Sequence, residues 1–353
     1  MKLQSHLDFF QLLNDFISKH KSGKLLLKNG ARMRKGSIAN YENLCKILKE
    51  FCDFTGFELR VLKSKRNIHN QFRKEKNYWK KFYFQFTRYL YNTRNCHDNY
   101  TGTLIKLIRS FFNYLEREKG INLGNVQRSF YVRHENIPII VLNLDQLHQL
   151  IYNEELETRL CNRLKKAKDI FVFGCTVGCR YSDLKQLTNL NLESIFKGTY
   201  LKLTSKKTGT FSRMKLPVYA VNILEKYKGK FSTLLPPLHL SNLIKYIREV
   251  AEVAGWTYPV EKVRQKQGRY KEIKSQKSVG YRFCDIISTH TMRKTAITTY
   301  LSLGMPEQMV RRISGHSPGS KEFFRYVNYA QAYLDLEAEK VFKRLACKDT
   351  LLT

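Results

Sequence analysis

The sequence predicts a mainly α-helical protein with one small β-hairpin or sheet, of the α+β class, built as two domains. The chain has 353 residues, which is enough for two domains that each bury a core of their own. Apolar residues recur at helical spacing in both halves, and the periodicity is lost between them, over residues 121–138. One pair of short alternating segments, at 200–204 and 213–216, indicates two strands joined by a turn.

Residues 1–36 are expected to form a short helix followed by a basic tether. From Leu7 to Ile17 the apolar residues recur at helical spacing. The following stretch, KSGKLLLKNGARMRKGS, is basic and contains glycines, so it predicts a flexible connector. Its residues from Lys24 to Lys35 are candidates for contact with a polyanion, and a solvated linker is an equally good interpretation.

Residues 37–120 are expected to form a small, basic, all-helical domain. Its first helix starts at Ser37 and stops at Gly56, and its last one covers Asn99–Lys119. Between them, a helix over Asn70–Asn92 mixes lysines and arginines with aromatic residues. The spacing of these aromatics is more typical of a core face than of a surface that stacks on nucleotides, and the lysines are better candidates for phosphate contact.

Residues 121–138 end in Pro138 and are interpreted as a linker to a second domain at 139–353. This domain opens with a helix whose start is predicted by a capping-box pattern at Asn143 and Gln146. It contains the predicted hairpin and ends in an amphipathic tail helix over residues 331–345. A basic insertion, Lys262–Lys277, is interpreted as a mobile surface hairpin, with contact to nucleic acid as the alternative.

The composition is strongly basic, with 63 lysines and arginines against 30 aspartates and glutamates and a formal net charge of +33. Because the basic residues occur in both halves of the chain, the charge favours a polyanionic partner. Charge alone does not separate an enzyme from a passive or ribosome-associated binding protein. It identifies the kind of partner and leaves the chemistry open.

The eight cysteines include no CxxC pair, which favours a reducing compartment. Cys175 and Cys179 lie in an apolar helical run without a partner at zinc-ligand spacing, so we expect no metal and no cofactor. The N-terminus lacks the uninterrupted apolar core of a signal peptide, and no later apolar run is long enough to span a bilayer. These features predict a cytoplasmic protein.

Two segments of the second domain carry candidates for chemistry. The box Gly178–Leu184, with the sequence GCRYSDL, holds Arg180 and Asp183, which on their own would be interpreted as a surface ion pair on a helix. The turn of the predicted hairpin holds Lys207, with Lys206 as the second choice. An ammonium group on such a turn can protonate a leaving oxygen, and the plain alternative is a solvated lysine.

A third segment is more specific, because its candidates occur in a fixed order. His290 and Arg293 lie three residues apart and therefore on one face of a helix. His316 follows Gly315 at the end of the next predicted helix, where a capping histidine is the plain interpretation. Tyr326 comes ten residues later. Guanidinium groups bind phosphate oxygens, imidazole transfers protons near neutral pH and tyrosine can act as a nucleophile, so the set predicts phosphoryl transfer.

Together these segments resemble the catalytic domain of the tyrosine recombinases, the phage integrase family, over residues 140–335. The resemblance implies that Tyr326 is the nucleophile and that Asp183 is a supporting residue. It implies the following catalytic residues: Arg180, Lys207, His290, Arg293, His316 and Tyr326.

The resemblance also implies a function, that of a site-specific recombinase of the kind found on bacterial mobile elements. Such an enzyme cleaves DNA through a 3′-phosphotyrosyl intermediate and rejoins it, for integration, excision or inversion, without metal or ATP. Residues 37–120 would be a core-binding, SAM-like domain that forms a C-shaped DNA clamp with the catalytic domain. The implied partners are double-stranded DNA at a core recombination site and other copies of the chain in a synaptic homotetramer. Accessory DNA-bending proteins are a further class of partner that the resemblance allows. The tail would dock on a neighbouring subunit or pack in cis, and the DNA-bound protein would be associated with the nucleoid.

Three alternatives remain open on the sequence alone. The spacing from Gly-His to Tyr326 is one residue longer than the commonest family pattern, which keeps Tyr329 and Tyr333 as alternative nucleophiles. A type IB topoisomerase has a similar set of residues. In this sequence, however, the motif His-x-x-Arg begins with His290, and a histidine at that position favours a recombinase. A non-catalytic DNA-binding regulator would use residues 290–314 as a helix-turn-helix, whereas the complete set of functional residues favours an enzyme.

Overall fold

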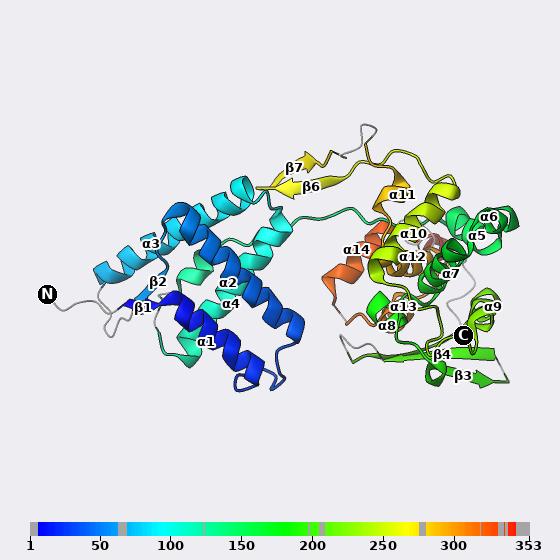
Figure 1. Ribbon diagram of the computed structural model, residues 1–353, viewed down its shortest axis with the longest axis horizontal. Coiled ribbons are helices and arrows are strands. Elements are labelled where there is room, and N and C mark those ends of the chain that lie inside the picture. Colours follow the sequence, from blue (N-terminus) through cyan, green and yellow to red (C-terminus); the bar gives the residue numbers. More distant parts are fainter. Residues whose placement is uncertain are drawn as a thin grey trace. The chain divides into compact units, whose positions relative to one another are not determined.

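The computed structural model describes residues 6–62, 69–121, 123, 125–196, 198–204, 209–274, 280–317, 319–330, 335 and 338–343. The chain divides into two compact units (Figure 1). The first consists of Met1–Ile137 together with Val263–Ile273, and the second of Pro138–Lys262 together with Lys274–Thr353. Both units combine helices with small antiparallel sheets, which confirms the predicted α+β class.

The first unit is a helical bundle with a two-stranded antiparallel sheet, in which Leu7 lies opposite Val61. The π-helix η1 continues α3 directly, and η2 is a short 3-10 helix. The elements before the linker are β1 (His6–Asp8), α1 (Phe9–Ser22), α2 (Lys35–Thr55), β2 (Arg60–Leu62), α3 (His69–Arg88), η1 (Tyr89–Thr93), α4 (Asp98–Glu118) and η2 (Val126–Ser129).

Helix α1 belongs to the core of the first unit. The side chain of Asp8 caps its start by accepting the N–H groups of Phe10 at 2.7 Å and Gln11 at 3.1 Å. Phe9 and Leu13 are buried in the same apolar cluster as residues of α2, α3 and α4. The sequence predicts this helix on a tether, whereas its apolar stripe docks on the bundle, because an apolar face left in water would be unfavourable.

The aromatic residues of α3 form the centre of the bundle. Trp79, Phe82 and Phe86 are fully buried, and the rings of Phe82 and Phe86 stack with centroids 5.3 Å apart. The interpretation of their spacing as a core face is therefore confirmed. Phe84, on the same helix, is exposed.

The second unit packs its helices around α7 and adds a three-stranded antiparallel sheet with the order β3-β4-β5. Its elements are α5 (Leu144–Tyr152), α6 (Glu154–Arg159), α7 (Asn162–Val177), α8 (Tyr181–Leu184), η3 (Asn189–Asn191), β3 (Leu192–Ile195), β4 (Gly198–Thr204), β5 (Phe211–Lys215), α9 (Val218–Tyr227), α10 (Leu240–Val253), α11 (Phe283–Ile286), α12 (Thr289–Ser302), α13 (Glu307–Ser314) and α14 (Lys321–Tyr329).

Two local predictions for this unit are confirmed. The predicted hairpin is formed by β4 and β5, with Tyr200 opposite Lys215. The capping box at the start of α5 is also present, since Asn143 Oδ1 accepts the N–H of Gln146 at 2.8 Å and Gln146 Oε1 accepts the N–H of Asn143 at 3.0 Å. Strand β3, which pairs with the other edge of β4, is too short to be predicted from alternation.

Helix α7 packs against α12 at the centre of this unit. A Cβ at Gly174 would come within 2.4 Å of the Met292 sulfur, so a glycine permits the close approach of these two helices. The segment that follows α7 carries Arg180, and α12 carries Arg293. The packing of α7 on α12 therefore brings the two predicted arginine segments side by side.

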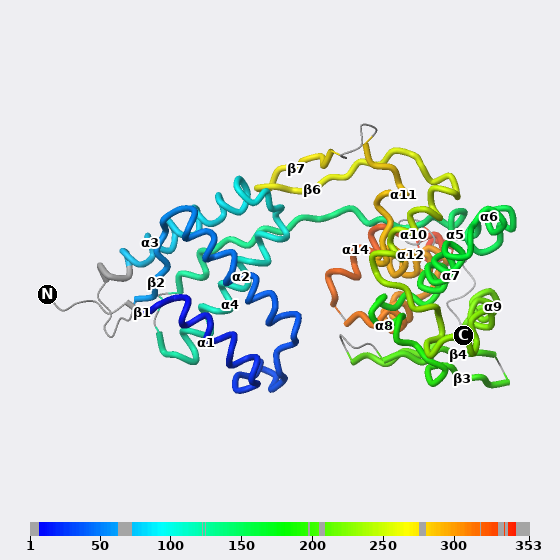
Figure 2. The backbone as a smooth tube through the Cα atoms, in the orientation of Figure 1, coloured from blue at the N-terminus to red at the C-terminus, as the bar shows by residue number. Residues whose placement is uncertain are grey.

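The basic insertion forms a second hairpin, β6 (Val263–Lys266) and β7 (Arg269–Glu272), which belongs to the first unit. Figure 2 shows this hairpin in yellow, and in the sequence it comes after α10 and before α11. In the tail, residues 338–343 are helical, with Val341 and Phe342 exposed, and the rest of the predicted tail helix except Asp335 lies outside the described residues. Within the part of the chain that is described, no helix is both long and apolar enough to cross a membrane.

Candidate active site

Arg180 stands at the junction between α7 and α8. Helix α7 ends at Gly178, whose φ of 64° is left-handed, and a Cβ at this position would lie 3.1 Å from that of Ala296 on α12. A glycine is favoured on both counts. Two residues later, Arg180 is the N-cap residue of α8 and is half-buried.

Arg293 is only 3% exposed and ties α12 to the end of α7. Its Nη1 donates a hydrogen bond of 3.0 Å to the carbonyl oxygen of Gly178. Burial, followed by the positive charge of Arg180, lowers the pKa of Arg293 to about 10, so the guanidinium group is still protonated at neutral pH. Two positive groups are thus held close together, an arrangement that a bound anion would stabilise.

His316 is positioned by the end of α13. Gly315 ends this helix with a left-handed φ of 65°, and the N–H of His316 donates to the carbonyl of Arg311 at 3.0 Å. Nδ1 lies 2.8 Å from Ser314 Oγ, whose hydroxyl donates to the Val310 carbonyl at 2.7 Å. The contact with Ser314 holds the imidazole ring at the end of α13, next to Arg293.

The ring of His316 lies against the guanidinium group of Arg293. Nη2 of Arg293 is 3.2 Å from Nε2 and 3.3 Å from Nδ1 of His316. Burial, followed by the charge of Arg293, lowers the pKa of His316 to about 3. The imidazole is therefore neutral at pH 7 in the protein alone, and an anion bound beside the ring would favour its protonation.

The depressed pKa of His316 predicts a loss of stability in acid. The unfolded chain takes up a proton at this imidazole near pH 6.5, and the folded protein does so only near pH 3, so the free energy of unfolding should fall as the pH drops between these values. We expect His316→Asn to reduce this pH dependence in urea unfolding experiments, and the exposed His148→Asn to leave it unchanged. If the free energy of unfolding varies with pH in the same way for the wild type and for His316→Asn, the lowered pKa of His316 is contradicted.

Tyr326 lies on α14 beside His316. Its side chain is 5% exposed, and its ring centroid is 5.9 Å from that of His316 and 6.4 Å from that of Phe323. Burial raises the pKa of the Tyr326 hydroxyl, and the nearby charge of Arg293 opposes this effect. The structure thus brings together Arg293, His316 and Tyr326 from α12, the end of α13 and α14.

The alternative tyrosines are less well placed. Tyr329, on the same helix, is 52% exposed. Tyr333 lies outside the described residues. Of the described candidates, Tyr326 is the one that the helix turns toward the arginines.

His290 and Asp183 border the same site. His290 is on the first turn of α12, and desolvation followed by the positive charge of Lys294 lowers its pKa. Asp183 is 5% exposed, and neither of its carboxylate oxygens has a hydrogen-bond partner among the described residues. Its negative charge opposes the lowering of the Arg293 pKa, and its supporting role stays a prediction.

Lys207 and Lys206 lie outside the described residues, so the structure gives no position for either ammonium group. The flanking strands β4 and β5 are paired in register up to Thr204 and Phe211. The role of the turn lysine stays a prediction.

Two residues near the site were not predicted. Ser314 fixes the orientation of the His316 ring, and Arg311 packs over the rings of Phe323 and Phe324 at 4.8 and 5.0 Å. The position of Ser314 directly before Gly315 was the one sequence signal for its role. The sequence around Arg311 carries no such signal, because its aromatic partners lie on the next helix.

No model of a known protein family and no curated protein matches the chain. Solved structures do match. The Tn1549 transposon integrase in complex with a circular intermediate DNA aligns with a TM-score of 0.57 and 12% identity, covering 91% of this chain and 94% of that one. A lambda integrase tetramer bound to a Holliday junction aligns with a TM-score of 0.55 and 13% identity, covering 89% and 79%. XerH site-specific recombinase bound to difH substrate aligns with a TM-score of 0.51 and 12% identity, covering 94% of each chain.

These three proteins are tyrosine recombinases, and the alignments span both units of the chain. The chain therefore has the tyrosine recombinase fold. The resemblance that the sequence motifs indicate is confirmed at the level of the fold.

Proposed function

We propose that the protein is a site-specific DNA recombinase that cuts and rejoins DNA strands through a covalent bond between Tyr326 and a 3′ phosphate. The observation that carries this proposal is the convergence of Arg293, His316 and Tyr326 beside Arg180. These side chains come from separate segments of the chain, and they combine positive charge, a hydrogen-bonding imidazole and a candidate nucleophile. The tyrosine recombinase fold and the net charge of +33 support the same conclusion.

The positive groups would bind the phosphate at which cleavage occurs. Attack on phosphorus produces a five-coordinate species with additional negative charge on its nonbridging oxygens. Forked guanidinium groups can each contact two of these oxygens, so Arg180 and Arg293 would stabilise that charge. His316 would donate a further hydrogen bond from Nε2 once phosphate binding has protonated it. Since these side chains supply the positive charge, the proposed reaction uses no metal.

The nucleophile needs a proton acceptor, because burial raises the pKa of Tyr326. Neutral His290, on the adjacent first turn of α12, would accept the phenolic proton. The bond from phosphorus to the 5′ oxygen then breaks as the phosphotyrosyl bond forms, and the 5′ oxygen receives a proton. Attack by the 5′ hydroxyl of another strand reverses the reaction, so the bond energy is retained and no ATP is needed.

Lys207 is proposed as the acid that protonates the leaving 5′ oxygen. We expect Lys207→Ala to slow cleavage of ordinary DNA by about 10²–10⁴-fold, the usual contribution of a general acid. A substrate with a 5′ phosphorothiolate should restore the rate, because a thiolate leaves without protonation. The measurement is the rate of covalent adduct formation on both substrates. Loss of cleavage on both, with DNA binding intact, would show that Lys207 has another role, and Lys206→Ala would then be compared.

The proposed assembly is a homotetramer on double-stranded DNA. One of the similar structures is a tetramer bound to a Holliday junction, and the others are bound to DNA. We propose the same kind of complex here, because exchange of strands between two duplexes requires four cleavage sites. Integration, excision and inversion share this chemistry.

The experiment that tests the proposal uses a nicked duplex that carries the attachment site of the protein's host element. Cleavage next to the nick releases a short fragment, so religation fails and the covalent complex accumulates. A denaturation-resistant adduct at the 3′ phosphate is the expected result. Tight binding without an adduct would favour a non-catalytic regulator, and rapid relaxation of supercoiled DNA of any sequence would favour a topoisomerase.

A further inference from the structure

The β6–β7 hairpin has a defined docking site on the first unit. In sequence it lies between α10 and α11 of the second unit, yet Val263–Ile273 groups with the first. Its strands pair with Val263 opposite Glu272 and Lys266 opposite Arg269. Gln267 and Gly268 form the turn, both with positive φ, at 56° and 79°. This is the backbone of a tight two-residue hairpin loop.

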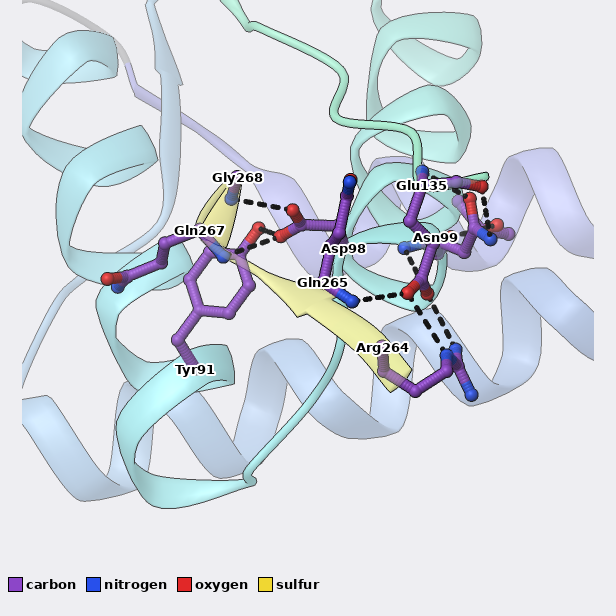
Figure 3. A network of polar contacts seen from close by, with 9 residues as sticks. Tyr91, Asp98, Asn99, Glu135, Arg264, Gln265, Gln267 and Gly268 are labelled. Atoms are coloured by element: carbon purple, nitrogen blue, oxygen red, sulfur yellow. Dashed lines mark hydrogen bonds and ion pairs between the residues drawn. The ribbon is translucent and has the colours of Figure 1, made fainter. Parts of the chain in front are cut away.

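Glu135 is the first acceptor for the hairpin. It is 6% exposed, and its carboxylate receives hydrogen bonds from Arg264 Nε at 3.0 Å and Nη2 at 2.6 Å. The backbone N–H of Gln265 adds a third at 2.7 Å (Figure 3). The forked contact fixes both the position and the orientation of strand β6.

Asp98 is the second acceptor, at the start of α4, and is almost fully buried. It receives the N–H groups of Gln267 at 2.8 Å and Gly268 at 2.7 Å, and the hydroxyl of Tyr91 at 2.6 Å. The dashed lines in Figure 3 show that the turn of the hairpin closes over this carboxylate. Because buried carboxylates require such donors, the hairpin supplies hydrogen bonds that Tyr91 alone could not give Asp98 and Asn99 alone could not give Glu135.

A basic groove of about 680 Å³ lies next to the docked turn. Its charged lining residues are Arg88 from α3, Arg133 from the linker and Arg269 from β7. Arg133 lies against the turn, since a Cβ at Gly268 would be 3.0 Å from its Nη1. None of the three guanidinium groups is ion-paired with a carboxylate in the described part of the chain, and no acidic residue lines the groove.

We propose that docking of the β6–β7 hairpin completes a phosphate-binding groove for the DNA backbone, formed by Arg88, Arg133 and Arg269. The proposal rests on the proposed function in one respect, that DNA is the ligand. The hairpin contributes Arg269 directly, and it covers Asp98 and Glu135, whose negative charges would otherwise repel a phosphate. Guanidinium groups without acidic partners are suited to phosphodiester oxygens, which position DNA without reading its sequence.

The first test measures the salt dependence of binding to a labelled duplex of arbitrary sequence. Each phosphate contact that is lost reduces the slope of log K against log salt by about 0.9. The double variant Arg88→Ala/Arg269→Ala should therefore reduce the slope by roughly two such steps. The matched control, Arg117→Ala/Arg128→Ala, removes two exposed arginines of the same unit that do not line the groove. Equal slopes for both double variants would overturn the proposal.

The second test asks whether the hairpin must be docked. Asp98→Asn should increase hydrogen exchange at the amides of Gln267 and Gly268 and reduce the slope as Arg269→Ala does. Adding Arg269→Ala to Asp98→Asn should then change the slope no further. If Asp98→Asn fails to fold, Arg264→Gln replaces it, because this variant removes the forked contact of the hairpin with Glu135. Suppose that Arg269→Ala reduces the slope by the same amount in the wild type, in Asp98→Asn and in Arg264→Gln. Docking of the hairpin would then not be needed to build the groove.

The nicked attachment-site duplex separates failure of this proposal from failure of the proposed function. An adduct with wild-type protein, together with unchanged slopes for Arg88→Ala/Arg269→Ala, would reject the groove and retain the recombinase. No adduct, together with a reduced slope, would retain the groove as a DNA-binding site of a protein that is not a recombinase.

Discussion

Tyr326→Phe should abolish the covalent protein–DNA adduct while leaving DNA binding unchanged. The substitution removes one hydroxyl group and keeps the ring that packs against His316 and Phe323. The fold of α14 should therefore persist, and the loss should be complete because no other oxygen occupies the same position. The measurement is adduct formation on the nicked duplex, with binding by gel shift and thermal unfolding recorded in parallel.

Tyr329→Phe is the matched control for this prediction. Tyr329 lies on the same helix and is exposed, so its substitution should leave the adduct in place. An adduct that survives Tyr326→Phe and disappears with Tyr329→Phe would reassign the nucleophile. If both variants retain the adduct, Tyr333→Phe becomes the next variant to test.

The helices and the hairpin of the second unit could be predicted because their signals are local. Apolar spacing, the Asn143 cap and the alternating strands act within a few residues of sequence, and the structure has each of them. The docking of α1 and of the β6–β7 hairpin could not be predicted. Both depend on partners far away in sequence, such as Asp98 and Glu135 for the hairpin.

The candidate site shows the same limit. The order of Arg180, Arg293, His316 and Tyr326 along the chain predicts a common site, and the described structure brings these residues together. The lowered pKa of His316 could not be predicted, because it follows from burial and from the charge of Arg293, which is far away in the sequence. Local sequence therefore predicts which side chains share the candidate site, whereas their protonation depends on the packing around them.

Arg293→Lys should reduce the rate of adduct formation by about 10²–10³-fold, the usual effect of removing one donor that stabilises a developing negative charge. Lysine keeps the charge, but a single ammonium group cannot bond the Gly178 carbonyl and also present a planar fork to phosphate. The defect should appear at saturating DNA, because the donor matters most as charge develops on phosphorus.

The control for this prediction is Arg312→Lys, an exposed arginine on α13 whose substitution should leave single-turnover cleavage unchanged. Thermal unfolding of both variants separates loss of folding from loss of chemistry. A normal cleavage rate for Arg293→Lys would mean that positive charge alone is sufficient at this position. The buried bond from Arg293 to Gly178 would then have a structural purpose, holding α12 against the end of α7, and Arg180 would be left as the guanidinium that contacts the phosphate.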